Sequence, residues 1–265
     1  MCILGEITER ILPIREQTIM IKNDSQKIPC YKKAYFVRAE GKKQIFLQST
    51  CALPISIGQS YHEGEKFLST VYLINKNFKQ CIIFVADLLQ RFTLQIVSPQ
   101  LTEEQAYQRS IQNGQEWIDR NQNHLNTMTI PFRVIFWSQL LEQPEFYSLK
   151  KRVDHLYEHN ESFKNTLDGI AETYIKRQTN TIHSNEESSR IKQLVIDYIK
   201  EECAVEPLRN KESFDFTIYP SQTPLSFLIA LYENLLPDQT NAPNRFITIR
   251  FKQRKEPLYI DANNT

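Results

Sequence analysis

Residues 51–57, CALPISI, form a short apolar run that ends at Gly58, and this stretch decides the fold. Residues 63–76 follow with apolar side chains at helical spacing, and QCIIFVA at residues 80–86 is a second buried run. Strand, helix and strand in this order predict a βαβ unit, in which the two strands are parallel.

The residues before this unit predict a strand pair. AYFVR at residues 34–38 and KQIFLQ at residues 43–48 are two short runs of strand-forming composition, joined through Glu40 and Gly41. We therefore expect a hairpin that leads into the first strand of the βαβ unit.

The rest of the chain alternates between helix and strand signals. We expect a helix over 102–125, which opens with the capping box T-E-E-Q at Thr102, and then a strand over 130–136. Helical segments follow to about residue 178, divided near Asn160 and interrupted by Gly169, and a surface loop spans 179–189. The last expected elements are a helix over 190–202, a strand over 213–219, a helix from Thr223 and Pro224 to about residue 236, and a strand over 245–251. This alternation predicts a parallel sheet.

The fold class that follows is α/β, with a single Rossmann-like domain over residues 1–265 and a mostly parallel sheet flanked by helices. It lacks G-x-G-x-x-G. Within the domain, residues 1–45 are expected to be a basic strand and hairpin region, and residues 237–265 a C-terminal strand and tail.

Composition limits the class of protein. The 265 residues are 41% hydrophobic, so the chain can bury a hydrophobic core. The net charge is +1, so any site for a polyanion must be a local patch. The five cysteines are widely separated without a C-x-x-C pair, which favours a reduced cytosol. The first apolar run is broken by charged residues, and no stretch approaches the roughly 20 apolar residues that span a bilayer. We expect a cytoplasmic protein.

Ser56 is a candidate nucleophile because of its position. It ends the first strand of the βαβ unit, and ligands of doubly wound sheets bind beyond the carboxyl ends of the strands. Gly58 lets the chain turn and lets a substrate approach closely. The alternative is ordinary turn chemistry, since serine and glycine are common where strands end.

Tyr198 and Glu202 share one apolar stripe of the helix expected over 190–202. A carboxylate on such a stripe is costly to bury unless it meets a cation, and an incoming ammonium group would supply one. The alternative is a helix end that has reached water. Tyr219, before Pro220, ends a later strand at the same carboxyl edge, where its phenol is either a proton relay or a buried core group.

H-L-Y-E-H at residues 155–159 is a competing signal. It matches the inverted zinc-peptidase pattern H-x-x-E-H, with His155 and His159 one helical turn apart and Glu158 between them. A five-residue pattern with two free positions also arises by chance in a charged helix.

Four ordered stretches resemble the motifs of the tRNA-dependent cyclodipeptide synthase family. They are A-L-P-I-S-I-G-Q-S-Y around Ser56, the stretch F-R-V-I-F-W-S-Q-L-L-E-Q-P-E-F at residues 132–146, the Tyr-x-x-x-Glu pair of Tyr198 and Glu202, and Y-P-S-Q-T-P from Tyr219. The resemblance extends from about residue 45 to 235. It is similar to the branch with a Tyr-Pro signature, because Gln59 and Pro220 stand where the other branch has Asn and His.

This resemblance implies a catalytic domain like that of class I tyrosyl- and tryptophanyl-tRNA synthetases without an ATP site. It implies an aminoacyltransferase that joins two aminoacyl groups from aminoacyl-tRNA into a cyclic dipeptide, a 2,5-diketopiperazine, by a ping-pong mechanism. The intermediates would be aminoacyl-Ser56 and then a dipeptidyl enzyme. No cofactor, metal or ATP would be required, and the protein would be a monomer.

The resemblance also assigns roles to residues. Tyr198 and Glu202 would hold the α-ammonium group of the substrate, and Tyr219 would relay a proton during cyclisation. The 2′-hydroxyl of the terminal adenosine would help to activate Ser56, since no histidine is well placed by sequence. The substrate-binding positions would be Gly58, Gln59, Ile83, Val85, Trp137 and Gln222.

Three positions depart from the family's usual pattern. Gln222 replaces an acidic residue, which bears on the second aminoacyl pocket. Trp137 is bulkier than is usual in the first pocket, so we expect it to favour a small first residue such as alanine or glycine. The helix over 102–125 offers only Arg109 and Arg120 against four acids, whereas many members have a basic helix there for tRNA.

The densest basic stretch lies near the N-terminus, and we expect tRNA phosphates to bind there. The candidates are Lys32, Lys33, Arg38, Lys42 and Lys43. The alternative is a solvated sheet edge protected by lysine. For the whole chain, the alternatives to a cyclodipeptide synthase are a non-catalytic aminoacyl-tRNA or RNA-binding relative and a zinc peptidase that uses His155, Glu158 and His159.

Overall fold

The computed structural model describes residues 26–37, 43–177, 184–220, 229–231, 233 and 245–262. Six strands form one sheet in the order β1-β6-β5-β2-β3-β4. They are β1 (Gln26–Phe36), β2 (Thr50–Ile55), β3 (Gln80–Val85), β4 (Phe132–Phe136), β5 (Phe216–Tyr219) and β6 (Phe246–Ala262). Every neighbouring pair is parallel except β1 with β6. The expected α/β domain with a mostly parallel sheet is confirmed.

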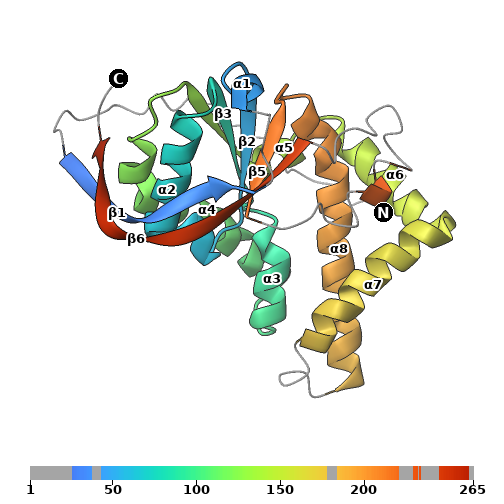
Figure 1. The fold of residues 1–265 in the computed structure, drawn as a ribbon. Helices are drawn as coiled ribbons and strands as arrows, with labels where there is room; N and C mark the ends of the chain where they lie inside the picture. The colour runs from blue at the N-terminus through green and yellow to red at the C-terminus, as the bar shows by residue number, and fades with distance from the viewer. Residues whose placement is uncertain are drawn as a thin grey trace, which may run out of the picture.

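Helices cover both faces of the sheet (Figure 1). One face packs on α2 (Gly64–Asn75) and α4 (Glu103–Leu125), around the buried rings of Phe67 and Trp117. The other packs on α8 (Asn185–Asn210), which in turn contacts α5 (Trp137–Leu141), α6 (Phe146–His159) and α7 (Glu161–Arg177). The short helix α3 (Gln90–Val97) contacts both α4 and α8. The sheet's carboxyl edge therefore opens between α3 and α8.

The start of α4 follows the sequence closely. The N–H of Gln105 donates to Thr102 Oγ1 at 3.2 Å, and the N–H of Thr102 donates to Gln105 Oε1 at 2.9 Å. The helix then runs to Leu125. The predicted capping box and the predicted extent of this helix are both confirmed.

The predicted N-terminal hairpin is wrong. Residues 43–46 form a short helix, α1, and β1 pairs with β6 instead, from Phe36 opposite Ile249 to Gln26 opposite Ala262, with a shift of register between Cys30 and Lys32. KQIFLQ carries three consecutive apolar residues rather than the alternation of a half-buried strand. Phe46 is buried, and its ring packs against those of Phe36, Phe78 and Phe216, so tertiary packing decides this segment.

Two helix boundaries also differ from the prediction. α7 is continuous through the exposed Gly169, because the buried Leu167 and Ala171 on either side offset the roughly 1 kcal/mol that a helical glycine costs. α8 begins at Asn185 and ends at Asn210, so it overlaps the predicted loop over 179–189 and extends past residue 202. Ser184 caps it by accepting from the N–H of Glu187 at 3.0 Å.

β1 and β6 form a long curved ribbon that extends from the sheet alongside α2 (Figure 1). β6 is longer than the strand predicted over 245–251. The inner side of the ribbon packs Cys30 and Ile260 against Leu68 of α2. The predicted helix start at Thr223 and Pro224 lies outside the described residues, although residues 229–231 and 233 are helical. None of the helices in the described ranges is long and apolar enough to cross a membrane.

Candidate active site

Two neighbouring parallel strands end at the same edge and bring two hydroxyl groups together. Ser56 directly follows β2, and Tyr219 is the last residue of β5. The Ser56 Oγ and Tyr219 OH atoms are 2.9 Å apart, and the Tyr61 OH lies 3.1 Å from the Tyr219 OH. Three hydroxyl groups from distant parts of the sequence thus form one hydrogen-bonded chain. Serine and tyrosine in such a chain supply a nucleophile and a path for its proton.

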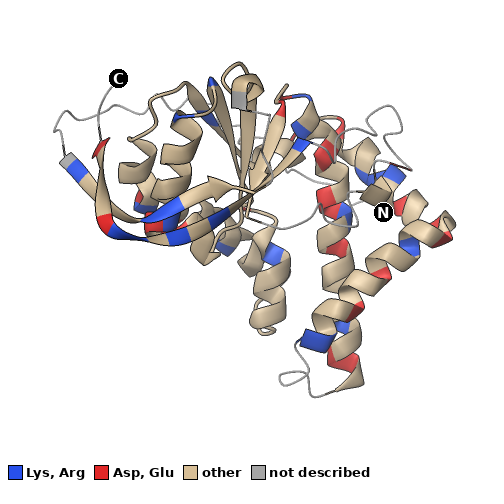
Figure 2. Cartoon of the chain, viewed as in Figure 1, with Lys and Arg blue, Asp and Glu red and all other residues tan. Residues whose placement is uncertain are grey.

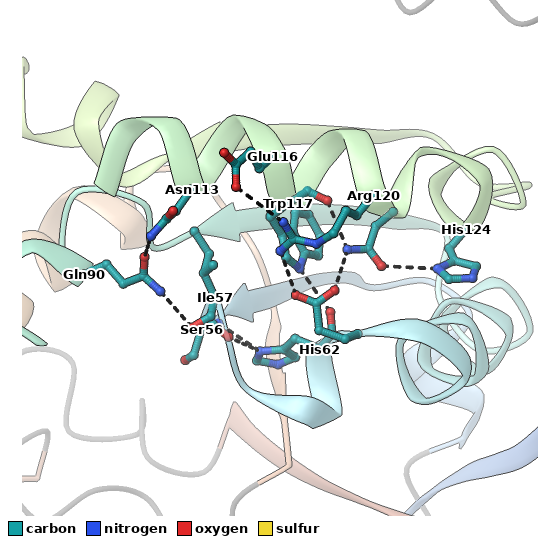
Figure 3. Close-up of polar contacts among 11 residues, drawn as sticks. Ser56, Ile57, His62, Gln90, Asn113, Glu116, Trp117, Arg120 and His124 are labelled. Carbon is teal, nitrogen blue, oxygen red and sulfur yellow. Dashed lines mark hydrogen bonds and ion pairs between the residues drawn. The ribbon is translucent and has the colours of Figure 1, made fainter. Parts of the chain in front are cut away.

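The loop after β2 is held from behind by a histidine that sequence reasoning missed. The N–H of Ser56 donates to His62 Nδ1 at 2.8 Å (Figure 3). Burial lowers the pKa of His62 to about 3, so the imidazole is neutral and its Nδ1 is free to accept. Trp117 Nε1 in turn donates to the His62 carbonyl at 3.0 Å. His62 follows Tyr61 directly, but only the turn at Gly58, with φ of 83°, brings its ring back beneath Ser56.

The other side of the loop is fixed by amide side chains. Gln90 Nε2 donates to the Ile57 carbonyl at 3.0 Å, and Asn113 Nδ2 donates to Gln90 Oε1 at 2.8 Å (Figure 3). Because Gln90 begins α3 and Asn113 lies in α4, two helices position the residue after Ser56. A side chain whose backbone is held on both sides by rigid elements keeps its geometry.

A cavity of about 360 Å³ lies in front of Ser56. Apolar side chains form most of its wall, and its polar groups converge from β2, β5 and α8. The cavity is lined by Pro54, Ile55, Ser56, Phe84, Ala86, Leu89, Thr93, Ile96, Trp137, Ile170, Tyr174, Val195, Tyr198, Ile199, Glu202, Glu206, Arg209, Tyr219 and Phe246. An apolar cavity with a few converging polar groups is typical of a small-molecule site.

α8 contributes a polar stripe to this cavity. Tyr198 and Glu202 are one turn apart and both line it, as their spacing predicts. Burial raises the pKa of Glu202 to about 8, with Arg209 opposing the shift and Glu206 and Glu201 adding to it. Burial also raises the pKa of Tyr198, and the Glu202 carboxylate adds to this shift. A carboxyl group with a pKa near neutrality suits both binding an ammonium group and accepting a proton from it.

Further along α8, two charged residues that the sequence analysis did not single out complete the polar stripe. Arg209 Nη1 donates to Glu206 Oε2 at 2.8 Å, and the Arg209 guanidinium packs over the Phe84 ring at 4.9 Å. The predicted helix stopped at residue 202, so these positions were not recognised as part of the same face.

The structure brings together Ser56, Trp137, Tyr198, Glu202 and Tyr219 around one cavity. Four of the other predicted substrate-binding residues, Gly58, Gln59, Ile83 and Val85, do not line it. Gly58 and Gln59 are exposed and do not line the cavity, and Gln222 lies outside the described residues.

The alternation of β3 places Ile83 and Val85 on the face away from the cavity. Both side chains are fully buried on the face that packs against α2 and α4, and neither lines the cavity. Phe84, between them, points to the opposite face of the sheet and lines the cavity. The shift of one position exchanges the two faces of a strand.

The basic residues of the ribbon lie on strands that are far apart in sequence. Lys33 of β1 is directly opposite Lys252 of β6, and Figure 2 shows further basic residues along both strands. Lys32 donates to Gln253 Oε1 at 2.6 Å. Arg38 and Lys42 lie outside the described residues, and the side chain of Lys43 is not described. Of the predicted basic residues, Lys32 and Lys33 therefore lie on one strand of a two-stranded basic surface.

The H-x-x-E-H motif lies on α6. The rings of His155 and His159 stack at 4.1 Å, and both residues are exposed. Neither they nor Glu158 line the cavity. The described ranges contain no group of three or more His, Cys, Asp or Glu side chains that would hold a metal ion.

No protein-family model and no curated protein matches the sequence. Solved structures do match it. A cyclodipeptide synthase (CDPS) from Fluoribacter dumoffii is 34% identical, and the match covers 84% of this chain and 99% of that chain with a TM-score of 0.76.

Two more distant structures share the fold. A cyclodipeptide synthase from Candidatus Glomeribacter gigasporarum, bound to Phe-tRNAPhe, is 20% identical over 78% of this chain and 89% of that chain, with a TM-score of 0.64. A Mycobacterium tuberculosis protein, described as a cyclodipeptide synthetase related to type I tRNA synthetases, is 11% identical over 85% of this chain and 95% of that chain, with a TM-score of 0.56.

The Fluoribacter enzyme carries the family assignment, because its identity to this chain extends over nearly its whole length. The two distant structures add that the same fold recurs where little sequence is shared. The chain belongs to the cyclodipeptide synthase family.

Proposed function

We propose that this protein joins the aminoacyl groups of two aminoacyl-tRNA molecules into a cyclic dipeptide, with Ser56 as the nucleophile. The observation that carries the proposal is the contact of 2.9 Å between Ser56 Oγ and the Tyr219 phenol, at the wall of a cavity that Tyr198 and Glu202 also line. Family membership supports the reaction class. The residue roles rest on this geometry.

In the first half-reaction, Ser56 Oγ attacks the ester carbonyl of the first aminoacyl-tRNA. A bond forms between Oγ and the acyl carbon, the bond to the ribose oxygen breaks, and the serine proton passes to the leaving ribose oxygen. In this proposal the neighbouring 2′-hydroxyl and the Tyr219 phenol, which is 2.9 Å from Oγ, relay it. Because the tRNA ester is already activated, positioning is enough and the step needs neither ATP nor a metal ion.

Tyr198 and Glu202 hold the α-ammonium group of the bound aminoacyl moiety. A cation beside Glu202 favours its ionised form, which offsets the burial that raises its pKa to about 8 in the empty cavity. Glu202 can then accept a proton from the ammonium group, which leaves a nucleophilic amine.

In the second half-reaction this amine attacks the ester carbonyl of a second aminoacyl-tRNA. A peptide bond forms, the bond from the acyl carbon to the ribose oxygen breaks, and a proton of the attacking amine passes to that oxygen, so the tRNA leaves and a dipeptidyl enzyme remains. The new terminal amine then attacks the Ser56 ester carbonyl, closes the six-membered ring and returns the proton to Ser56 Oγ. Tyr219, 2.9 Å from Oγ, relays this proton. The product leaves as a diketopiperazine.

The ribbon of β1 and β6 supports binding of the tRNA backbone. Lys33 and Lys252 face each other across the strands, and like charges in this position repel unless an anion lies between them. Lys66, Arg250 and Lys252 also line a second hollow that Tyr61 reaches from the active-site loop. A phosphate backbone on this surface would lie close to the Ser56 loop.

Because the proposed substrate is aminoacyl-tRNA, we infer that the reaction takes place in the cytoplasm.

Expression in a bacterial host tests the function. Culture medium is searched by mass spectrometry for cyclic dipeptides, with Ser56→Ala in parallel and Ser60→Ala as the matched control, since Ser60 is an exposed serine of the same loop. We expect a product that Ser56→Ala lowers at least about a thousandfold and Ser60→Ala preserves. Product from Ser56→Ala at the wild-type level would rule out the serine intermediate. Soluble protein that binds charged tRNA without making product, also when purified, would indicate a non-catalytic relative.

A further inference from the structure

Three helices meet behind the cavity wall at a buried ion pair. Arg91 of α3 binds Glu201 of α8 through both guanidinium nitrogens, with Nη1 donating to Oε1 at 2.8 Å and Nη2 donating to Oε2. Trp137, the first residue of α5, donates its Nε1–H to the same Glu201 Oε1 at 3.0 Å. One carboxylate oxygen therefore connects the indole to the arginine.

The positions of these side chains relative to the cavity differ. Trp137 lines it, whereas Glu201 and Arg91 do not, so the ion pair lies behind the indole. Glu201 is 2% exposed. A buried ion pair often stabilises a fold no more than apolar side chains of equal volume would, but its hydrogen bonds fix orientation. The ion pair therefore orients the ring more than it stabilises the fold.

The backbone beside Trp137 is held as well. Asp87 accepts from the N–H of Ser138 at 3.0 Å and from the Ser138 hydroxyl at 2.7 Å, which fixes the start of α5. Phe92, next to Arg91, also packs its ring edge-on against Tyr198 at 6.3 Å. Asp87 holds the residue after Trp137 and Glu201 holds the ring nitrogen, so both contacts restrict rotation of the indole.

We propose that Glu201 is a positioning residue that, with Arg91, holds the Trp137 indole as a rigid wall and so sets which first aminoacyl side chain the cavity accepts. The proposal rests on the proposed function. Without Glu201, the indole loses its hydrogen-bond acceptor, rotates and enlarges the space in front of it. Larger aminoacyl groups then enter, and the product ratio changes rather than only the yield.

The test uses the whole protein and an equal mixture of tRNAs charged with glycine, alanine, leucine and phenylalanine. Glu201→Leu alone would leave the Arg91 guanidinium without its ion-pair partner, so the variant is the charge-balanced Arg91→Met/Glu201→Leu. Trp137→Phe removes the donor, and a triple variant combines all three changes. Glu212→Gln is the control, because it breaks an ion pair with Arg133 that does not line the cavity. Circular dichroism confirms that each variant is folded.

We expect Arg91→Met/Glu201→Leu to change the ratio of large to small first residues by about tenfold, as loss of a hydrogen bond to a charged group implies. The triple variant should match Trp137→Phe, because both changes act through one contact. Glu212→Gln should leave the ratio unchanged. An unchanged ratio in the double variant, or effects that multiply in the triple one, would overturn the proposal. A wild-type protein that makes no cyclic dipeptide would instead overturn the proposed function on which it rests.

Discussion

Glu202 combines a cost in stability with a role in substrate binding. Its pKa in the folded protein is about 8, against an ordinary value of 4.5, because burial disfavours the carboxylate. The folded state therefore binds this proton more tightly than the unfolded state, and the free energy of unfolding falls as pH rises from about 4.5 to 8. With a neutral side chain at this position the folded protein would be more stable at high pH, so the carboxyl group of Glu202 is better explained by a chemical role than by stability.

We expect Glu202→Gln to raise the free energy of unfolding at pH 8.5 by roughly 2–4 kcal/mol more than it does at pH 4.5. Product formation should fall by at least about tenfold, because the α-ammonium group loses its counter-ion. Urea unfolding at both pH values measures the first effect, with Tyr198→Phe as a control whose side chain carries no charge there. An equal change at both pH values would show that another group titrates.

The bulk of Trp137 fills part of the cavity wall, and this predicts which substrates are excluded. In Trp137→Leu the indole is replaced by a smaller side chain, so larger first residues should appear in the product spectrum. Mass spectrometry of the culture medium measures the shift. Phe78→Leu is the control, because Phe78 is buried on the opposite face of the sheet and does not line the cavity. If Trp137→Leu leaves the spectrum unchanged, the wall does not select the first residue.

At the scale of elements, the support behind the proposed nucleophile depends on how closely α4 approaches the end of β3. A Cβ atom at Gly114 would lie 2.6 Å from Asp87 Cβ, which cannot move without shifting the α5 start that Asp87 holds. Gly169 in α7 is also helical but has nothing within 4 Å of such a Cβ. The two glycines form a matched pair.

We expect Gly114→Ala to destabilise the fold by about 1–3 kcal/mol, because overcrowding exceeds the gain in helix propensity. Gly169→Ala should stabilise it by about 0.5–1 kcal/mol. Thermal unfolding followed by circular dichroism distinguishes the two. A stabilising Gly114→Ala would mean that α4 and Asp87 separate at little cost, so this contact would not be part of a rigid support.

At the scale of the whole molecule, the net charge is only +1, but Lys and Arg side chains gather on the ribbon of β1 and β6 (Figure 2). In Lys33→Ala/Lys252→Ala we expect weaker tRNA binding and a salt dependence that is shallower by about 1–2 in the slope of log K against log salt. Fluorescence anisotropy titrations with tRNA would measure this slope between roughly 50 and 200 mM salt, a range over which affinity for a nucleic acid falls steeply. Arg109→Ala is the control, since Arg109 in α4 is paired with Glu116. A larger effect from Arg109→Ala would move the tRNA surface to α4.

The sequence by itself determined the type and order of most elements, because apolar period, capping residues and strand ends are local signals. It also pointed to Ser56, Tyr198, Glu202 and Tyr219, since residues at strand ends and on one helix stripe are placed by the elements that carry them. The structure brings all four to one cavity.

Only the tertiary structure decided the contacts between distant segments. The pairing of β1 with β6, and with it the basic ribbon, joins the two ends of the described chain, which no local pattern encodes. The bond from Arg91 to Glu201 spans 110 residues, and His62 reaches Ser56 only through the turn between them. Such contacts are selected by burial and by the need of buried polar groups for partners, and both arise only when the whole chain has packed.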